Sequence, residues 1–210
     1  MSAPTGSDEP ARSIEIERKY DVSADTVLPD WTALPGVASV GAPEARALDA
    51  RYFDTADAAL ARARVAVRRR EGGPDAGWHV KISAPDGRHE WHWPLGDAPA
   101  DGPVPDAVAG AVAPWASPPF SPIARIRNHR VAYALRDAAG IPLAEVVDDH
   151  VTALSVRTGR ESSWREWEVE IVGELPAPDA AALFAAADAL VAAAGGAVAA
   201  SDSKLARALA

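Results

Sequence analysis

The sequence predicts a mainly β (α+β) fold of about eight strands, with a few helices packed outside them. Many segments alternate charged and apolar side chains with a period of two, which is typical of strands that present two different faces. Turn-forming stretches such as 72–77 (GGPDAG) and 84–87 (APDG) lie between these segments and favour hairpins. The 210 residues suffice for one large domain, and the composition, 48% hydrophobic and without cysteine, is that of an ordinary globular protein.

The elements follow from local signals along the chain. Residues 1–12 are small, polar and proline-bearing, so we expect a disordered segment there and a single domain over 13–210. The first strand is expected over 13–20, and a short helix capped by Ser23 or Asp25 should end near Leu34. Further strands are expected twice within 34–55 and at 65–73, 77–83, 88–95, 123–137, 141–154 and 163–173, and further helices at 56–64, 105–116 and 177–194.

The charged faces of these strands are segregated into acidic and basic blocks. The first strand places Glu15, Glu17 and Lys19 on one face, and we expect the opposite face, with Ile14, Ile16, Arg18 and Tyr20, to pack on the core. The same rhythm places charge at Glu145, Asp149, Glu166, Glu168 and Glu170 in the acidic strands and at Arg68, Arg70, Lys81, Arg88, Arg125 and Arg127 in the basic strands. Exposure to solvent would explain one strand with a charged face. Rows of like charge on several strands of an open surface would instead repel one another without any compensating interaction. In a closed barrel the charged faces would line a lumen, where they need a metal or a charged ligand.

Charge and hydropathy exclude several function classes. The net charge of −9 argues against general nucleic-acid binding, whereas 62–70 (RARVAVRRR) carries five arginines in nine positions. An acidic protein with basic strands suggests an internal anionic ligand. Because neither a signal peptide nor an 18-residue apolar run is present in the sequence, we expect a cytoplasmic location without membrane contact.

The order of these motifs resembles the CYTH superfamily, also called triphosphate tunnel metalloenzymes. Its E-x-E-x-K strand matches Glu15, Glu17 and Lys19 in EIERK. The later matches are RYFDT at 51–55, HVKIS at 79–83, GRHEW at 87–91, EVVDD at 145–149, EWEVE at 166–170 and SK at 203–204. The resemblance spans about 13–209 and is greatest to the N-terminal part of proteins in which a CYTH domain precedes a helical CHAD domain.

The resemblance implies an eight-stranded antiparallel tunnel that holds Mg²⁺ or Mn²⁺ and a triphosphate. The catalytic residues implied by position are Glu17, Lys19 and Glu168. Those implied for phosphate are Lys19, Arg68, Arg70, Lys81, Arg88, Arg125, Arg127 and Lys204, and those implied for the metal are Glu15, Glu17, Glu145, Asp149, Glu166, Glu168 and Glu170. Asp148 and Asp149 are adjacent, so only one can face inward, and the phase of Glu145 favours Asp149. Ser83 departs from the family, which commonly has a second basic or polar partner there.

The leading functional prediction is a metal-dependent triphosphatase that hydrolyses inorganic triphosphate, or a short polyphosphate or nucleoside triphosphate. The alternatives are a thiamine triphosphatase, a polyphosphate-binding module with little turnover, and a class IV adenylyl cyclase, for which no adenine-specific determinant is visible. The expected partners are the small-molecule substrate and a CHAD domain in a longer parent protein, and the chain is expected to be a monomer or homodimer. Trp91 and Trp93 are expected to pack outward under a helix, and Asp54 or Thr55 to cap the helix that follows RYFDT.

Overall fold

The computed structural model describes residues 9–84, 87–96, 99–201 and 203–210. Its elements are β1 (Ala11–Glu15), β2 (Glu17–Val22), η1 (Trp31–Ala33), β3 (Ser39–Val40), β4 (Glu44–Asp54), α1 (Ala59–Arg62), β5 (Val65–Glu71), β6 (Gly77–Ala84), β7 (Gly87–Pro94), α2 (Asp106–Ala111), β8 (Ser121–Arg136), β9 (Pro142–Ser155), β10 (Glu161–Ile171), α3 (Ala177–Ala193), β11 (Ala197–Val198) and α4 (Lys204–Leu209). Of the helices in these residues, none has the length and apolarity that crossing a lipid bilayer requires.

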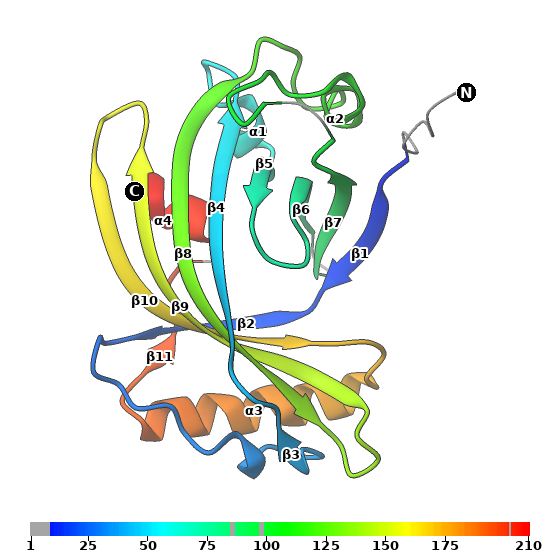
Figure 1. Ribbon diagram of the computed structural model, residues 1–210, viewed down its shortest axis with the longest axis vertical. Coiled ribbons are helices and arrows are strands. Elements are labelled where there is room, and N and C mark those ends of the chain that lie inside the picture. The colour runs from blue at the N-terminus through cyan, green and yellow to red at the C-terminus, as the bar shows by residue number, and fades with distance from the viewer. Residues whose placement is uncertain (1–8, 85–86, 97–98, 202) are drawn as a thin grey trace.

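The strands of the described residues form one antiparallel sheet that closes on itself (Figure 1). Their order is β1-β7-β6-β5-β4-β8-β9-β10-β2-β11, with β3 beside β8. β1 and β2 are halves of one extended segment interrupted at Ile16, and β1 pairs with β7 while β2 pairs with β10, so this segment joins the two ends of the sheet. With β1 and β2 taken as one strand, and without the two-residue β3 and β11, eight strands form the wall. The predicted mainly β tunnel is confirmed.

Strand β10 shows how the two-residue alternation builds this wall. Trp167 and Val169 are fully buried in a core that α3 covers from outside, with Leu183 and Val191 on its buried face. The glutamates between them point to the other side of the sheet, because successive side chains of a strand alternate. Figure 1 shows α3 lying across the outer face of β2, β9 and β10. The apolar residues therefore point outward, under a helix, and the charged residues point inward, as predicted.

A second core lies outside β5, β6 and β7, beneath α1 and α2. Val65, Val67 and Trp93 are buried in it, and Trp91 packs against Trp115, so the expectation for the two tryptophans is confirmed. The carboxylate of Asp54 accepts hydrogen bonds from the backbone amides of Leu60 (2.9 Å) and Ala61 (3.0 Å), and the hydroxyl of Thr55 accepts one from Ala59 (2.9 Å). The end of RYFDT therefore caps α1, as predicted.

The C-terminal helix α4 lies on the inner side of the sheet. Leu205 and Ala208 pack with Ala50, Ile126 and Val151 of β4, β8 and β9. Figure 1 shows α4 within the curve of the strands β8, β9 and β10. This end of the barrel interior is therefore apolar and filled by the helix, and the charged interior begins beyond it.

Three local expectations differ from the structure. The helix expected over 23–34 is reduced to η1, because Ser23 bonds locally to Asp25 (2.8 Å) and Thr26, and because the residue before Pro29 disfavours α geometry. β1 begins at Ala11, inside the segment expected to be disordered, and residues 1–8 of that segment lie outside the described residues.

The expectation that this face of the first strand packs on the core is confirmed for Tyr20, which is fully buried, and is wrong for Ile14 and Ile16, which are 51% and 46% exposed. The core beneath α3 includes Tyr20 and Val22 of β2 and contains no residue of β1.

Candidate active site

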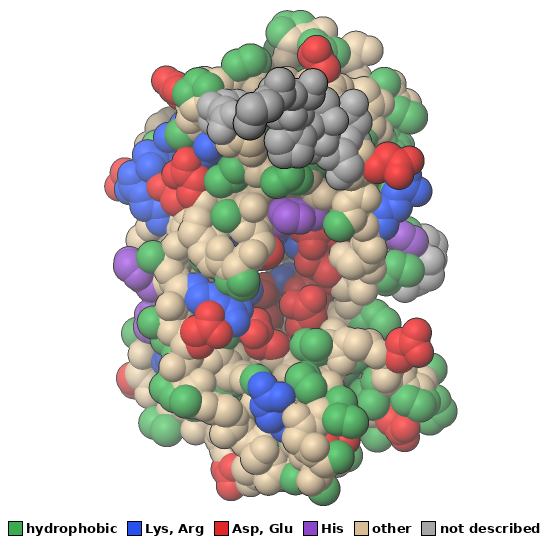
Figure 2. Space-filling model, turned by 45° about the vertical axis from the view of Figure 1, so that its right-hand side comes forward, with side chains coloured by type: hydrophobic (Ala, Val, Ile, Leu, Met, Phe, Trp, Pro, Cys, Tyr) green, Lys and Arg blue, Asp and Glu red, His purple; other side chains and the backbone are tan. Residues whose placement is uncertain are grey.

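The barrel encloses a cavity of about 780 Å³ that charged side chains line from both sides. Figure 2 shows the hollow from outside, with acidic and basic side chains gathered on its floor. The predicted residues that line it are Glu15, Glu17, Lys19, Arg68, Arg70, Lys81, Arg88, Glu145, Glu168, Glu170 and Lys204. They come from strands far apart in sequence, and closure of the sheet brings them together.

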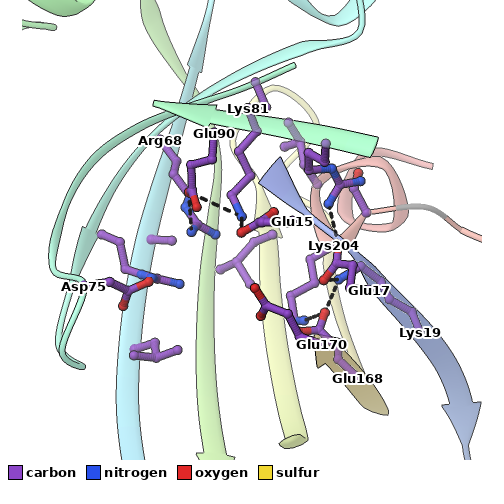
Figure 3. Close-up of a pocket in the computed structure, with 18 of the residues that line it drawn as sticks. Glu15, Glu17, Lys19, Arg68, Asp75, Lys81, Glu90, Glu168, Glu170 and Lys204 are labelled. Carbon is purple, nitrogen blue, oxygen red and sulfur yellow. Dashed lines mark hydrogen bonds and ion pairs between the residues drawn. The ribbon is translucent and has the colours of Figure 1, made fainter. Parts of the chain in front are cut away.

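The acidic wall consists of Glu15, Glu17, Glu168 and Glu170, from β1, β2 and β10. Register explains the grouping, because Glu17 lies opposite Glu170 in the pairing of β2 with β10. The carboxylate of Glu17 accepts hydrogen bonds from Lys19 Nζ at 2.9 Å and from Arg88 at 3.0 Å. Three of these carboxylates therefore have cationic neighbours, but the wall as a whole is crowded with negative charge (Figure 3).

Glu170 is the member of the acidic wall whose charge is least compensated. Within the described part of the chain it has no ion-pair partner. Burial and the nearby carboxylates of Glu15 and Glu17 raise the pKa of Glu170 to about 7. A carboxylate in this position favours binding of a cation.

The basic wall consists of Arg68, Arg70, Lys81 and Arg88, from β5, β6 and β7. Arg68 Nε and Arg70 Nε are buried and have no hydrogen-bond partner among the described residues. Burial and the neighbouring guanidinium groups of Arg68 and Arg130 lower the pKa of Arg70 to about 9. This wall has buried donors without partners in the described residues and closely spaced guanidinium groups, which favours binding of an anion.

Glu90 and Tyr52, which the predicted site residues omitted, organise this basic wall. The Glu90 carboxylate lies 3.4 Å from Lys81, 3.5 Å from Arg68 and 2.6 Å from Nδ1 of the buried His79. Tyr52 is buried beside Arg68, and although burial opposes ionisation, that guanidinium lowers the pKa of the Tyr52 phenol. Tyr52 belongs to RYFDT, so that motif contributes a side chain to the lumen as well as the cap of α1.

Lys204 occupies the most compact carboxylate cluster in the described residues. Oxygens of Asp149, Glu166 and Glu168 lie within 4.8 Å of one another, a spacing that would suit a metal ion. Lys204 Nζ lies 2.8 Å, 2.6 Å and 2.7 Å from these three carboxylates. Because an ammonium group and a divalent ion cannot share the same oxygens, this cluster is closed to a metal while Lys204 remains in place.

Glu168 links the Lys204 cluster to the cavity. It accepts hydrogen bonds from Lys19, from Lys204 at 2.7 Å and from Arg130 at 2.8 Å. Burial alone would raise its pKa, but these three cations hold the pKa of Glu168 well below its usual range. Glu166 and Asp149 lie behind Lys204 and do not line the cavity, so the structure places these two predicted metal ligands in an ion-pair network instead.

Arg130 is a cavity residue that the predicted site omitted. Its guanidinium donates to both oxygens of Asp149, at 2.8 Å and 2.7 Å, and to Glu168. It shares an inward face of β8 with Ile126 and Asn128, which also line the cavity. The i, i+2, i+4 spacing of these three residues was the available signal.

Arg125 and Arg127, predicted to hold phosphate, lie on the outer face of β8. Arg125 pairs with Asp49 at 2.5 Å, Arg127 lies 3.5 Å from the same carboxylate with its side chain 60% exposed, and neither lines the cavity. The expected inward direction is wrong because the lumen beside this strand is apolar, where Ile126 packs in the cluster with α4. The apolar residues of β8 are therefore the inward ones here.

Strand β9 takes the register that the sequence favours. Asp149 points inward and is fully buried, whereas the carboxylate of Asp148 accepts hydrogen bonds from Arg165 at 2.8 Å and 2.9 Å on the other face. Glu145 lines the cavity and forms an ion pair with Arg46 at 2.9 Å, so it is a compensated carboxylate at the border of the acidic wall.

Comparison with known proteins agrees with this architecture. An uncharacterized protein of Mycobacterium tuberculosis, present in strains CDC 1551 and H37Rv, is 41% identical over 98% of this chain, and the chain spans 42% of its length. A proposed adenylate cyclase from Bacillus halodurans has a similar structure with a TM-score of 0.63, at 20% identity over 95% of this chain and 99% of the other.

A proposed adenylyl cyclase from Hippeastrum, described as having a dominant triphosphatase activity, has a TM-score of 0.53, at 16% identity over 92% and 94% of the two chains. At these identities the two structures establish the fold. The family model of the CYTH domain matches residues 13–209, nearly the whole chain, and the chain therefore belongs to the CYTH domain family.

Proposed function

We propose that this chain is a metal-dependent triphosphatase that hydrolyses inorganic triphosphate inside the barrel. The observation that carries the proposal is that one cavity has a basic wall with unused buried donors on one side and an incompletely compensated acidic wall on the other. Arg68 Nε and Arg70 Nε have no hydrogen-bond partner in the part of the chain that the structure describes, and across the lumen Glu170 has no ion-pair partner there. A triphosphate that carries a divalent cation supplies the missing anion to one wall and the missing cation to the other.

The basic wall suits the phosphate chain. Guanidinium groups bind phosphate oxygens through paired hydrogen bonds, and an ammonium group acts as a point charge. Hydrolysis of a phosphoanhydride needs the charge on the nonbridging oxygens neutralised and a water molecule held in line, with little covalent help from the protein. Arg68, Arg70, Lys81 and Arg88 would neutralise the oxygens, and Lys19, which contacts Glu17 and Glu168, would orient the water.

The acidic wall suits a hard divalent cation such as Mg²⁺ or Mn²⁺. Carboxylate oxygens are the ligands that these ions prefer, and the uncompensated carboxylate of Glu170 faces Glu15 and Glu17. We assign the metal to these three residues rather than to the cluster that Lys204 fills. When bound, the ion would neutralise phosphate charge and lower the pKa of a coordinated water.

The relatives bear on the choice of reaction. The triphosphatase activity described for the Hippeastrum protein supports hydrolysis over cyclisation. The curated relatives are more than twice as long as this chain, and we propose a CHAD domain for the additional length. A second candidate function is polyphosphate binding with little turnover, which is favoured by the closure of the Asp149, Glu166 and Glu168 cluster by Lys204.

The test is phosphate release from inorganic triphosphate, ATP, thiamine triphosphate and long polyphosphate, each with Mg²⁺, Mn²⁺ or excess EDTA. We expect turnover that is highest on inorganic triphosphate and abolished by EDTA. Glu17→Gln should lower kcat by about 10- to 100-fold, as disturbance of a metal site does. Glu161→Gln, the same change at the exposed start of β10, should leave kcat unchanged. Full turnover in EDTA, or equal kcat in the two variants, would contradict the proposal.

A further inference from the structure

Asp75 brings a carboxylate into the cavity from the turn between β5 and β6. It lines the lumen and forms an ion pair with Arg70, while its own side chain stays 51% exposed. Figure 3 shows Asp75 apart from the acidic cluster of Glu15, Glu17 and Glu170. A carboxylate of the turn therefore lies against Arg70, where the bound phosphate chain would need a cationic partner.

The turn is shaped to hold Asp75 in this position. Gly72 and Gly73 adopt positive φ angles of 77° and 76°, and a Cβ on Gly72 would lie 2.0 Å from the Ala47 carbonyl oxygen, so the turn lies tightly on β4. Nε2 of the buried His79 lies 3.0 Å from the backbone carbonyl oxygen of Asp75. The backbone is thus anchored independently of the Asp75 carboxylate, which is left to contact Arg70.

Arg70 has a strong requirement for an anion. It is 7% exposed, lies beside Arg68 and Arg130, and its Nε has no hydrogen-bond partner in the described residues. Asp75 compensates this charge in part, through one contact at the solvent-facing side of the lumen. A carboxylate and a phosphate present the same kind of oxygen pair to a guanidinium group, so both cannot occupy this face of Arg70.

We propose that Asp75 is an internal anion that occupies a phosphate position on Arg70 and that substrate must displace, so that it sets the affinity for the phosphate chain. The inference rests on the proposed function, since it takes the anion to be a triphosphate. It has a distinctive consequence: removing this charge should tighten substrate binding, whereas removing a charge from the basic wall should weaken it.

The test measures binding of inorganic triphosphate by calorimetry in EDTA, where the cationic side chains act without a metal, together with KM and kcat in Mg²⁺. Asp75→Asn keeps a turn-forming residue and the anchored backbone. Because a half-exposed ion pair is a modest competitor, we expect the Kd and KM to fall about three- to tenfold, with kcat within twofold. Asp75→Glu retains the carboxylate and should bind as the wild type does.

Two controls separate competition at Arg70 from a general charge effect. Asp57→Asn removes one negative charge from an exposed ion pair with Arg62 outside the cavity and should leave the Kd unchanged. In an Arg70→Ala background, Asp75→Asn should tighten triphosphate binding by less than twofold. Without the Arg70 guanidinium, the Asp75 carboxylate has no phosphate position to occupy.

The outcomes are distinguishable from those of the proposed function. If the wild type binds triphosphate but does not hydrolyse it, the triphosphatase proposal fails. The ratio of the Kd of the wild type to that of Asp75→Asn still decides the role of Asp75. An unchanged or weaker Kd for Asp75→Asn overturns the inference, as does a gain that persists in Arg70→Ala. Absence of triphosphate binding by the wild type, with and without Mg²⁺, overturns both.

Discussion

Replacing Lys204 by methionine tests whether the ion-pair network behind the cavity holds the end of the barrel together. The Lys204 side chain is 13% exposed, and its ammonium group lies 2.6–2.8 Å from Asp149, Glu166 and Glu168. Burial opposes its charge, yet these carboxylates raise the pKa of Lys204 above its usual value. Methionine preserves the aliphatic stem and the helix propensity of α4 but leaves three buried carboxylates with one cation fewer.

The expected cost is large because the partners remain. Removing one side of a buried ion pair costs about 3–5 kcal/mol, since the other side is left buried and uncompensated. With a urea m value of about 2–3 kcal/mol/M for a chain of this size, the midpoint should fall by about 1–2.5 M at pH 7. Arg207→Met is the matched control, since Arg207 lies on the same helix and pairs with Asp21 at the surface with 34% of its side chain exposed, and it should cost at most about 1 kcal/mol.

Low pH and a bound metal ion should each reduce the loss of stability caused by Lys204→Met. Burial raises the pKa values of Asp149 and Glu168, but the cations outweigh it and hold both below their usual values in the wild type. Their stabilising contribution is thus present at neutral pH and is lost as the pH falls through the folded pKa values. Without Lys204 the carboxylates protonate at higher pH, so the difference between variant and wild type should shrink at pH 4.

The vacated cluster also has the spacing of a metal site, so Mn²⁺ should stabilise Lys204→Met more than Arg207→Met. Chemical unfolding followed by tryptophan fluorescence measures all of these effects. A midpoint shift no larger than that of Arg207→Met would refute this reasoning.

Two further predictions concern the cavity walls. Because the pKa of Glu170 is raised to about 7 from 4.5, the metal-free protein should lose stability as the pH rises from 4.5 to 7, and Glu170→Gln should gain about 3 kcal/mol at pH 8 and almost nothing at pH 4 by urea unfolding in EDTA. An equal gain at both pH values would show that charge is not the cause. Arg70→Ala should raise KM by about 10- to 100-fold, the loss of a charge-assisted contact worth about 1.5–3 kcal/mol, whereas Arg127→Ala, on the outer face, should leave KM within twofold. Similar KM values for the two arginine variants would contradict the orientation of β8.

Strand β10 shows how far the sequence alone determines the structure. The alternation in WREWEVEI separates Trp167 and Val169 from Glu166, Glu168 and Glu170, and the apolar face of that pattern is the one buried under α3. The register of β9, the cap of α1 and the charged lumen follow from equally local signals. In the strands, the two-residue period and the polarity of each side chain predict the same orientation.

Strand β8 shows what only the tertiary structure decided. The two-residue period of a strand shows which side chains share a face. It does not show which of the two faces points into the barrel, because the inward face depends on what fills the lumen at each level. Because α4 fills one end with Leu205 and Ala208, Ile126 points inward and Arg125 outward, against the rule that holds in β10.

The position of Lys204 likewise depends on contacts made across the barrel, because it meets carboxylates of β9 and β10 that are 36 or more residues away. No local pattern encodes such distances. Asp75 is only five residues from Arg70, but the packing of its turn on β4 is a tertiary contact. Local alternation therefore determined the composition of the two walls, and closure of the sheet around α4 decided which charges face a ligand and which the protein already neutralises.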